Sequence, residues 1–482
     1  MTGTLVGHDA HLIGGRWVRS AGEPIPVENP ATEQVVGHAP AGTAAEARAA
    51  LDAAVAAWPA WADTPLEERV ALVRRLADLL ERDVDELAAL IATEVGMPVH
   101  LARAAQVGLP IQVLRTTADL AADYPWREPL AAGEVVRVPA GVVVAITPWN
   151  MPLHQIAAKI GPALVAGCTV VLKPSEIAPL CAYALVERAV EAGIPPGVLN
   201  LVCGTGPVMG ETLVRDPRVA VVSLTGSVRS GARVAELAAP TITRVCLELG
   251  GKSANVLLDD TALDVAVPAA VQQAFFNSGQ ACNALTRLIV PSHQQAEVAE
   301  RLVAAVGALR TGDPFDPSSD LGPLVSARQR EAVRDHVRRA AGDGARLLAG
   351  GPEAPDGLPV GYYHRPTVVT DVRPESALAR EEVFGPVLAV LTHSGDDDAV
   401  RLANATDYGL AAGVWSADPA RARSVAARLR AGQVKINGAR TRDGLDAPFG
   451  GFGRSGLGRE LGRAGIDEFV ETTAVLGGDA IG

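Results

Sequence analysis

Short apolar runs rich in Val and Ile alternate with amphipathic segments along much of the chain. The runs are typical of buried strands, and apolar positions at helical spacing between them indicate helices. Strands are predicted over 135–146, with a break at Pro139, and over 169–172, 198–202 and 219–223, and helices over 154–166, 179–192 and 228–238. Repeated strand–helix units predict a parallel sheet covered by helices, with ligands at the carboxyl ends of its strands.

A second cycle of the same pattern follows Gly250-Gly251. It predicts strands over 254–258 and 287–290 and helices over 263–276, 293–309 and 326–341. Ahead of the first cycle, two short strands flank Gly14-Gly15, and helical patterns cover 43–58, 65–81 and 84–95. The fold class is therefore α/β, and 482 residues indicate two or three domains.

Composition narrows the class of partner. Hydrophobic residues make up 48% and charged residues 20% of the chain, and the formal net charge is −12. An acidic chain without a basic run does not favour nucleic acid or an anionic membrane, which leaves a small molecule as the partner. Residues 1–10 lack the pattern of a signal peptide, and no run of about 18 apolar residues predicts a membrane span, so we expect a cytoplasmic protein.

Five cysteines, none in a CxxC pair, predict neither a disulfide framework nor a metal site. One of them, Cys282, stands within 276–284, a run of small residues and side-chain amides. Small neighbours leave a thiol accessible, and nearby backbone N–H groups favour the reactive thiolate. A buried structural cysteine is the commoner role, so Cys282 becomes a candidate nucleophile only if the chain also supplies a base and a charge-stabilising donor.

Candidate partners for Cys282 are Asn150, which follows a predicted strand, and Glu248. The Asn150 amide can donate a hydrogen bond to an oxyanion, and an ordinary Asx turn is the alternative. Glu248 lies between Leu247 and Leu249, where apolar surroundings raise a carboxylate pKa toward the range of a general base. A salt-bridged Glu on a strand edge is the alternative for this residue.

Other polar groups at strand ends fit a nucleotide. Lys173 and Glu176 follow a strand, where they can meet ribose hydroxyls, and Ser227 opens a helix whose N–H groups can meet a phosphate. A solvated helix cap and simple N-capping explain these residues equally well. The run 204–210 is close to the dinucleotide fingerprint, but Met209 occupies its third glycine position, so the run alone predicts no Rossmann site.

Taken together and in order, these motifs resemble the NAD(P)-dependent aldehyde dehydrogenase superfamily, from Ile13 almost to the C-terminus. So many short motifs in one fixed order are not expected by chance. The segments that carry the resemblance are 148–150 (PWN), 173–176 (KPSE), 225–227 (TGS), 247–252 (LELGGK), 277–280 (NSGQ) with Cys282 and 286–287 (TR), 381–386 (EEVFGP), Asn404 with 408–410 (YGL), and 448–451 (PFGG).

The resemblance implies oxidation of an aldehyde to a carboxylic acid. Cys282 is then the nucleophile, and the Asn150 side chain and the Cys282 backbone N–H hold the oxyanion of the thiohemiacetal. Hydride transfer leaves a thioester on Cys282, and Glu248 activates the water that hydrolyses it. Lys159 matches the family lysine near the oxyanion side of the site.

NAD is the cofactor that the resemblance implies. Glu176 would repel a ribose 2′-phosphate, although such glutamates can swing aside, so NADP stays open. The implied cofactor contacts are Lys173 and Glu176 at the adenosine ribose, Trp149 and Ser227 near the pyrophosphate, Glu382 and Phe384 at the nicotinamide end, and Ile146, Thr147, Gly206, Gly210, Gly226, Leu249 and Gly250 along the site.

The family fold consists of two doubly wound parallel-sheet domains and a small β bridging arm. Here the cofactor domain corresponds to 1–119 and 138–247, the catalytic domain to 248–450, and the arm to 120–137 and 462–482. The arm builds dimers and tetramers in the family, so we expect a homodimer or a homotetramer.

Met151, Asn283 and Phe449 are the residues that the resemblance places in the substrate tunnel. Met151 stands where many relatives carry Phe, and Asn283 stands where an apolar residue is frequent. A flexible Met in place of Phe predicts a roomier tunnel. The identity of the aldehyde stays open.

Three rival interpretations make different demands on the sequence. A CoA-acylating relative would commonly lack the glutamate matched by Glu248. A non-catalytic relative would have lost Cys282, Glu248 or Asn150, and a cysteine hydrolase would need no cofactor site at Lys173 and Glu176. Because all these residues are present, the sequence favours the hydrolytic dehydrogenase.

Overall fold

The computed structural model describes residues 7–440 and 444–477, and the first predicted cycle forms an eight-stranded sheet within it. The strands of this sheet are β1 (Ala10–Ile13), β2 (Arg16–Arg19), β7 (Val142–Ile146), β8 (Thr169–Lys173), β9 (Leu199–Leu201), β10 (Val219–Thr225), β11 (Arg244–Glu248) and β19 (Gly456–Leu457). Their order is β19-β11-β10-β7-β8-β9-β1-β2. The five central strands are parallel, which confirms the first predicted sheet, and β1, β2 and β19 add antiparallel edges.

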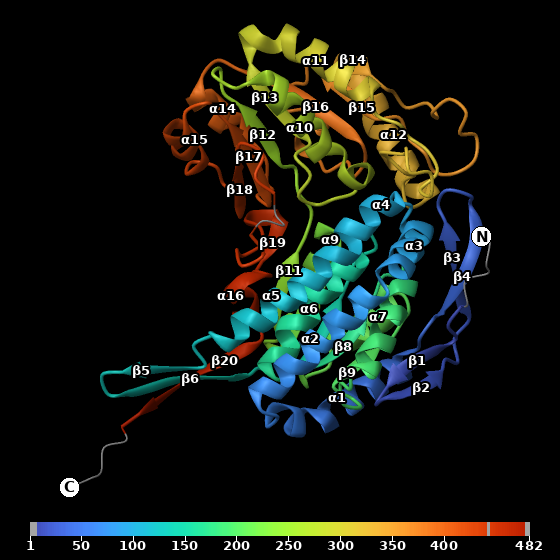
Figure 1. The fold of residues 1–482 in the computed structure, drawn as a ribbon, viewed down its shortest axis with the longest axis vertical. Helices are drawn as coiled ribbons and strands as arrows, with labels where there is room; N and C mark the ends of the chain where they lie inside the picture. The colour runs from blue at the N-terminus through green and yellow to red at the C-terminus, as the bar shows by residue number, and fades with distance from the viewer. Residues whose placement is uncertain (1–6, 441–443, 478–482) are drawn as a thin grey trace.

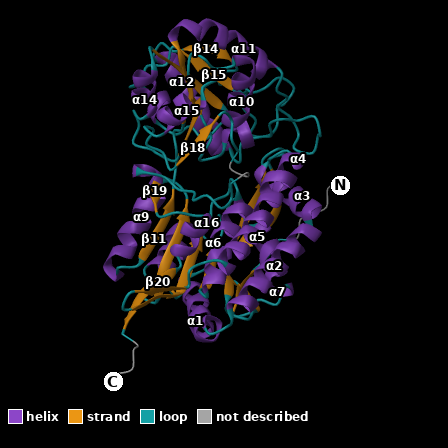
Figure 2. Ribbon diagram, turned by 60° about the vertical axis from the view of Figure 1, so that its left-hand side comes forward, coloured by secondary structure: helices purple, strands orange, loops and turns teal. Residues whose placement is uncertain are grey.

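Helices cover both faces of this sheet, and together they form the first lobe (Figures 1 and 2). They are α1 (Ala44–Ala62), α2 (Leu66–Arg82), α3 (Val84–Val95), α4 (Val99–Leu101), η1 (Ala102–Gly108), α5 (Leu109–Ala122), α6 (Pro152–Ala166), α7 (Leu180–Glu191), η2 (Gly206–Gly210), α8 (Glu211–Val214), α9 (Val228–Ala238), η3 (Ala239–Thr241) and α16 (Gly462–Asp467). Thr43 and Glu46 form a capping box at the start of α1, as their spacing predicts.

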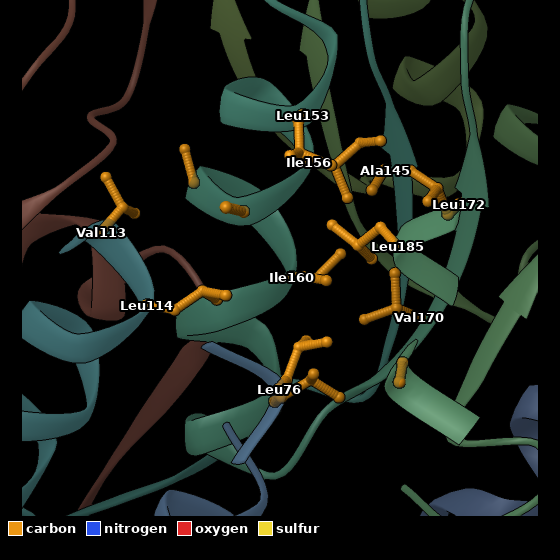
Figure 3. Close-up of a cluster of buried hydrophobic side chains, with 14 of the residues drawn as sticks. Leu76, Val113, Leu114, Ala145, Leu153, Ile156, Ile160, Val170, Leu172 and Leu185 are labelled. Atoms are coloured by element: carbon orange, nitrogen blue, oxygen red, sulfur yellow. The ribbon is translucent and has the colours of Figure 1, made fainter. Parts of the chain in front are cut away.

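Successive side chains of β7 point to opposite faces of the sheet, so the core of the first lobe forms two layers. Val143 and Ala145 join the cluster under α5 and α6, whereas Val142 and Val144 join the cluster under α1 and α9. In the first cluster, side chains of α6 point toward β7, β8 and α7, and α5 packs along the flank of α6 (Figure 3). This packing fixes α6, which begins directly after the loop that carries Asn150.

The second predicted cycle forms a seven-stranded sheet in the second lobe, with the order β14-β15-β16-β13-β12-β17-β18. Its strands are β12 (Ala254–Leu257), β13 (Arg287–Pro291), β14 (Arg346–Ala349), β15 (Thr367–Thr370), β16 (Val387–His393), β17 (Ala411–Trp415) and β18 (Gln433–Ile436). Its helices are α10 (Leu263–Phe275), η4 (Phe276–Gly279), η5 (Ser292–Gln294), α11 (Gln295–Gly307), α12 (Ala327–Gly342), α13 (Ala377–Arg380), α14 (Asp396–Ala403) and α15 (Pro419–Ala426), and η7 (Gly453–Ser455) directly precedes β19 of the first sheet. Apart from β14, the strands are parallel, so the predicted α/β class is confirmed for both lobes.

A three-stranded antiparallel sheet projects from the first lobe as an arm (Figure 1). It consists of β5 (Arg127–Leu130), β6 (Gly133–Pro139) and β20 (Val470–Leu476), with β6 in the middle. A separate two-stranded sheet pairs β3 (Pro24–Asn29) with β4 (Gln34–Pro40), two strands that were not predicted from the sequence. Within residues 7–440 and 444–477, no helix is long and apolar enough to cross a membrane.

Candidate active site

Four neighbouring strands of the first sheet end at one edge, and polar residues follow each of them. Residues 147–150 follow β7, Lys173 ends β8 ahead of Glu176, residues 226–227 follow β10, and Glu248 ends β11. Because parallel strands share their carboxyl edge, residues from distant parts of the sequence are brought together here. Hydrogen bonds join the strand ends, with Thr147 N–H donating to the Lys173 carbonyl at 3.0 Å and Gly226 N–H donating to the Glu248 carbonyl at 2.9 Å.

The second sheet contributes residues from the opposite, amino ends of its strands. Lys252 precedes β12, Cys282 precedes β13, and Glu382 and Phe384 precede β16. Contacts between the lobes join these residues to the carboxyl edge of the first sheet. The carboxyl-end rule therefore locates only half of the site.

The loop before Cys282 is held in an unusual backbone conformation. Asn277, Ser278 and Gly279 all have positive φ angles, of 52°, 55° and 73°, and the left-handed region costs a non-glycine residue roughly 1–2 kcal/mol. A Cβ atom at Gly279 would stand 2.1 Å from the Gly385 carbonyl oxygen, so only glycine fits there. Ser278 Oγ donates to the Gly322 carbonyl at 2.8 Å, which helps to hold the turn that presents Cys282.

Asn150 is bonded directly to the Cys282 loop. Its side-chain Nδ2 donates to the Gln280 backbone carbonyl at 2.9 Å. The backbone carbonyl of Asn150 accepts from Gln106 Nε2 at 2.8 Å and from Asn277 Nδ2 at 3.0 Å. The amide thus spans 130 residues of sequence to reach this loop, and the alternative of a local Asx turn is wrong. The second hydrogen of the amide group is available to an oxyanion at Cys282.

The Cys282 thiol is partly exposed but lies among carboxylates. Burial raises the pKa of Cys282 to about 12, and the charges of Glu382 and Glu248 add to the effect. The thiol is therefore protonated at neutral pH, and it needs a base or a nearby cation to become the nucleophile.

Glu248 is a buried carboxylate without a partner. Its exposed fraction is 1%, and within the described residues neither carboxylate oxygen has a hydrogen bond. Burial raises the pKa of Glu248 well above its ordinary value, and the charge of Glu460 raises it further. Within the same residues Glu248 has no ion pair, so the alternative of a salt-bridged Glu does not hold.

A buried ion pair lies near Glu248, and the sequence predicted only one of its members. Lys159 on α6 is 1% exposed, and its Nζ donates to Glu460 and to Ser223 Oγ, the latter at 3.1 Å. The Lys159 charge opposes the rise in the Glu248 pKa that Glu460 promotes. Glu460 was missed because its local sequence is unremarkable for a Gly-rich loop. Its one available signal is its position shortly after the motif at 448–451.

At the predicted adenosine end, Lys173 is 3% exposed, which contradicts a solvated helix cap. Its Nζ lies 3.6 Å from Glu176 Oε2 and donates to the Pro174 carbonyl at 3.0 Å. The Glu176 side chain is 42% exposed and can reach a ligand. Ser227 caps α9 by accepting from Ser230 N–H at 3.2 Å, so N-capping is confirmed for this residue and leaves the phosphate role as a prediction.

The predicted nicotinamide end joins the two lobes. Glu382 Oε1 accepts from Gly251 N–H at 3.0 Å, and burial raises the pKa of Glu382 to about 7. A Cβ atom at Gly250 would stand 2.4 Å from Glu382 Oε2, so the glycine turn makes room for this carboxylate. The rings of Trp149 and Phe384 meet edge to face, with their centroids 5.4 Å apart.

The other predicted residues lie on the same elements or next to residues already described. Their positions are as follows: Ile146 and Thr147 at the end of β7, Gly206 and Gly210 at the two ends of η2, Leu249 against Gly231 of α9, Met151 at the N-cap of α6, Asn283 next to Cys282, and Phe449 paired with Glu460 through reciprocal backbone hydrogen bonds. Gly210 lies close to Lys173, with 3.9 Å from a Cβ position at 210 to Lys173 Cδ. Met151 and Asn283 are partly exposed, and Phe449 is buried.

Known proteins match this chain over nearly its whole length. The sequence profile of the aldehyde dehydrogenase family matches residues 17–475. A 3-succinoylsemialdehyde-pyridine dehydrogenase from a Pseudomonas species is 45% identical, covering 96% of this chain and 98% of that protein.

Solved structures agree with the sequence relatives. An aldehyde dehydrogenase C mutant from Pseudomonas syringae, crystallised with NAD+ and octanal, superposes with a TM-score of 0.97 at 43% identity and covers 99% of each chain. An NAD-dependent aldehyde dehydrogenase from Sinorhizobium meliloti superposes with a TM-score of 0.94 at 38% identity, covering 98% of this chain and 94% of that one. The chain therefore belongs to the aldehyde dehydrogenase family and is an oxidoreductase that acts on aldehydes.

Proposed function

We propose that this chain oxidises an aldehyde to a carboxylic acid with NAD as the oxidant, through a thioester on Cys282. The observation that carries the proposal is the hydrogen bond between Asn150 Nδ2 and the Gln280 carbonyl. This bond holds an amide donor beside the Cys282 loop, and Glu248 lies within electrostatic reach of the same thiol. A nucleophile, an oxyanion donor and a base are the three groups that acyl transfer requires.

The proposed reaction begins at the Cys282 thiol, which gives its proton to Glu248 for release to solvent. The sulfur then adds to the aldehyde carbon, while Asn150 and the Cys282 backbone N–H donate to the oxygen that becomes negative. When bound, NAD accepts the hydride from the substrate carbon. The carbonyl then reforms as a thioester, and Glu248 takes a proton from the water that attacks it. The acid leaves, and the sulfur is regenerated as the thiol.

The residues present fit a dinucleotide. Lys173 and Glu176 offer a donor and an acceptor to ribose hydroxyls at the end of β8, and the N-terminus of α9 offers N–H groups to a phosphate. Glu382, which is bonded to the Gly250–Gly251 turn, is a second acceptor and suits the hydroxyls of the nicotinamide ribose. Glu176 favours NAD over NADP because its carboxylate repels a 2′-phosphate.

The role that we propose for the buried Lys159–Glu460 pair is in the step that activates water. Glu248 must give up a proton after each turnover, and its own carboxylate has no hydrogen bond in the described part of the chain. Lys159 is linked to Glu460, and both charges act on Glu248. The pair therefore tunes the proton affinity of Glu248 toward the range in which a carboxylate can both accept and release a proton.

We also propose the division into domains and the assembly that the sequence indicates. The cofactor domain is 1–119 and 138–247, the catalytic domain is 248–450, and the arm is 120–137 and 462–482. Support for a homodimer or homotetramer comes from the arm, because Val475 and Leu476 of β20 are 46% and 73% exposed on a three-stranded sheet that has little core of its own. A cytoplasmic location is supported by five cysteines that are all free.

The test is formation of reduced nicotinamide across a panel of aldehydes, with NAD and NADP in parallel. The panel includes octanal and a pyridyl semialdehyde, because a structural neighbour holds the first and a relative is named for the second. We expect turnover with NAD and release of the free acid with or without CoA. A product that appears only with CoA would contradict hydrolysis, and the absence of turnover by a folded, NAD-binding chain would contradict the function.

A further inference from the structure

Lysine is rare in this chain, and each lysine lies at or near the site. Of the 43 Lys and Arg residues, four are lysines, and they are Lys159, Lys173, Lys252 and Lys435. The first three are buried and the fourth is half-buried. An ammonium group is a compact charge that titrates when it is buried, whereas a guanidinium group stays charged. In a chain whose exposed cations are arginines, a buried lysine points to a role for its titratable charge.

Lys252 is the buried lysine that the proposed reaction does not use. It follows the Gly250–Gly251 turn, its exposed fraction is 1%, and its Nζ has no hydrogen-bond partner within residues 7–440 and 444–477. It lines a cavity of about 10 Å³, roughly the space of one water molecule. Tyr408, Arg430 and Arg287 line the same cavity.

Glu382 is the carboxylate whose charge acts most strongly on Lys252. The Glu382 side chain contacts the Gly250–Gly251 turn, which directly precedes Lys252, and its Oε1 accepts from Gly251 N–H at 3.0 Å. Within the part of the chain that is described, Glu382 forms no ion pair, and Lys252 is the cation whose charge lowers its pKa. The guanidinium of Arg287 donates instead to the Lys252, Leu402 and Ala403 carbonyls.

We propose that Lys252 is a positioning residue that keeps Glu382 ionised and thereby strengthens the hold on the nicotinamide ribose. The inference rests on the proposed function, in which Glu382 accepts hydrogen bonds from that ribose. An ionised carboxylate is a stronger acceptor than a protonated one. The charge on Lys252 therefore acts on the cofactor through Glu382, without touching it.

The surroundings of Lys252 set the pH range of this effect. Burial and the charge of Arg287 lower the pKa of Lys252 to about 7, and Glu382 and Glu381 oppose this. The other titratable or charged groups that face it are His336 on α12, whose pKa burial lowers to about 4, and Tyr408 and Arg430 on the cavity wall. His336 is thus neutral at neutral pH, which leaves Lys252 as the titrating cation.

The pKa values of Glu382 and Lys252 determine how NAD affinity should change with pH. Burial raises the pKa of Glu382 to about 7, so ribose binding weakens as the pH falls below neutrality. Loss of the Lys252 charge raises the Glu382 pKa further, so the weak-binding range extends upward. At pH 7, where the wild-type Glu382 carboxyl is about half ionised, we expect the Kd for NAD to increase about fivefold when the Glu382 pKa rises by one unit, and the difference to disappear near pH 9.5.

The experiment measures NAD binding by titration calorimetry from pH 6 to 9.5, using Lys252→Met, Lys252→Arg, Glu382→Gln and the double variant Lys252→Met with Glu382→Gln. Lys252→Gln is the second neutral variant, in case methionine does not allow folding. We expect Lys252→Arg to bind nearly as the wild type does. Because Lys252 acts through Glu382, we expect Lys252→Met to have no further effect once Glu382 is Gln.

Two results would overturn this inference alone: an NAD affinity of Lys252→Met that equals the wild type at every pH, or a loss that persists in the Glu382→Gln background. A wild-type chain that fails to bind NAD would overturn the proposed function together with this inference. A chain that binds NAD with the expected pH dependence but oxidises no aldehyde would overturn the proposed function and still support the link between Lys252 and Glu382.

Discussion

Gly450 approaches the carboxylate of Glu248 so closely that a Cβ atom at position 450 would stand 2.6 Å from Glu248 Oε1. Its φ angle of +149° is a further reason for glycine at this position. Gly450 directly follows Phe449, whose backbone N–H and carbonyl form reciprocal hydrogen bonds with the backbone of Glu460. The position of the unpaired carboxylate therefore depends on the absence of a side chain at residue 450.

Substitution Gly450→Ala should displace Glu248 and slow hydrolysis of the thioester. A misplacement of about 1 Å can reduce catalysis about 10²-fold, and we expect kcat to fall by about that factor. Gly342→Ala is the matched control, because it ends α12 and a Cβ atom there meets nothing within 4 Å. An unchanged kcat in Gly450→Ala would show that Glu248 is not the base.

Removal of one member of the Lys159–Glu460 pair should destabilise the fold. Lys159→Met leaves Glu460 as an unpaired buried charge, which costs about 3–5 kcal/mol of unfolding free energy. Because Lys159 also lowers the pKa of Glu248, the acidic limb of the kcat–pH profile should move to higher pH. Urea unfolding and a pH profile measure the two effects. The double variant with Met at both positions should recover most of the stability, and its failure to do so would contradict the pairing.

Alkylation of Cys282 should increase with pH without reaching a plateau below pH 10. Burial raises the pKa of this thiol to about 12, so the thiolate fraction grows about tenfold per pH unit. The other four cysteines are buried and should not react in the folded chain. Iodoacetamide labelling followed by peptide mass analysis tests this, with Cys282→Ala as the unlabelled control. A plateau near pH 8.5 would mean that the thiol is not shielded by its carboxylate neighbours.

Met151→Phe should narrow the tunnel and change the chain-length preference. Met151 is partly exposed at the N-cap of α6, one residue after Asn150. A rigid ring there should reduce kcat/KM for octanal about tenfold while leaving acetaldehyde nearly unchanged, since one or two misplaced methylene groups cost about 1–3 kcal/mol. Equal ratios of kcat/KM for the two aldehydes in the wild type and the variant would remove Met151 from the tunnel wall.

The first half of the site was predictable because strand ends can be identified in the sequence. Runs such as 142–146 and 169–173 mark buried strands, and in a parallel sheet their carboxyl ends meet at one edge. Asn150 and Lys173 could thus be assigned to one region before their contacts were known. Glu248 could not, because no strand was predicted over Arg244–Glu248, which forms β11. The catalytic chemistry then followed from the resemblance and not from spacing.

The other half depends on how the lobes meet, which no local pattern encodes. Cys282 and Glu382 lie at the amino ends of β13 and β16 and reach the first sheet through contacts between loops. Glu460 binds Lys159 across 301 residues of sequence, and its role comes entirely from that contact. The segment 99–122, which forms α4, η1 and α5, was also not predicted.

Thioester trapping tests the central claim most directly. Glu248→Gln is mixed with NAD and octanal, quenched in acid, and analysed by intact mass and peptide mapping. We expect one acyl group per chain on the peptide that contains Cys282, seen as a mass increase equal to the aldehyde less two hydrogens, and about one equivalent of reduced nicotinamide. The double variant Glu248→Gln with Cys282→Ala should show neither the adduct nor the reduced nicotinamide. Reduced nicotinamide formed without an adduct on Cys282, or turnover that survives Cys282→Ala, would contradict the account.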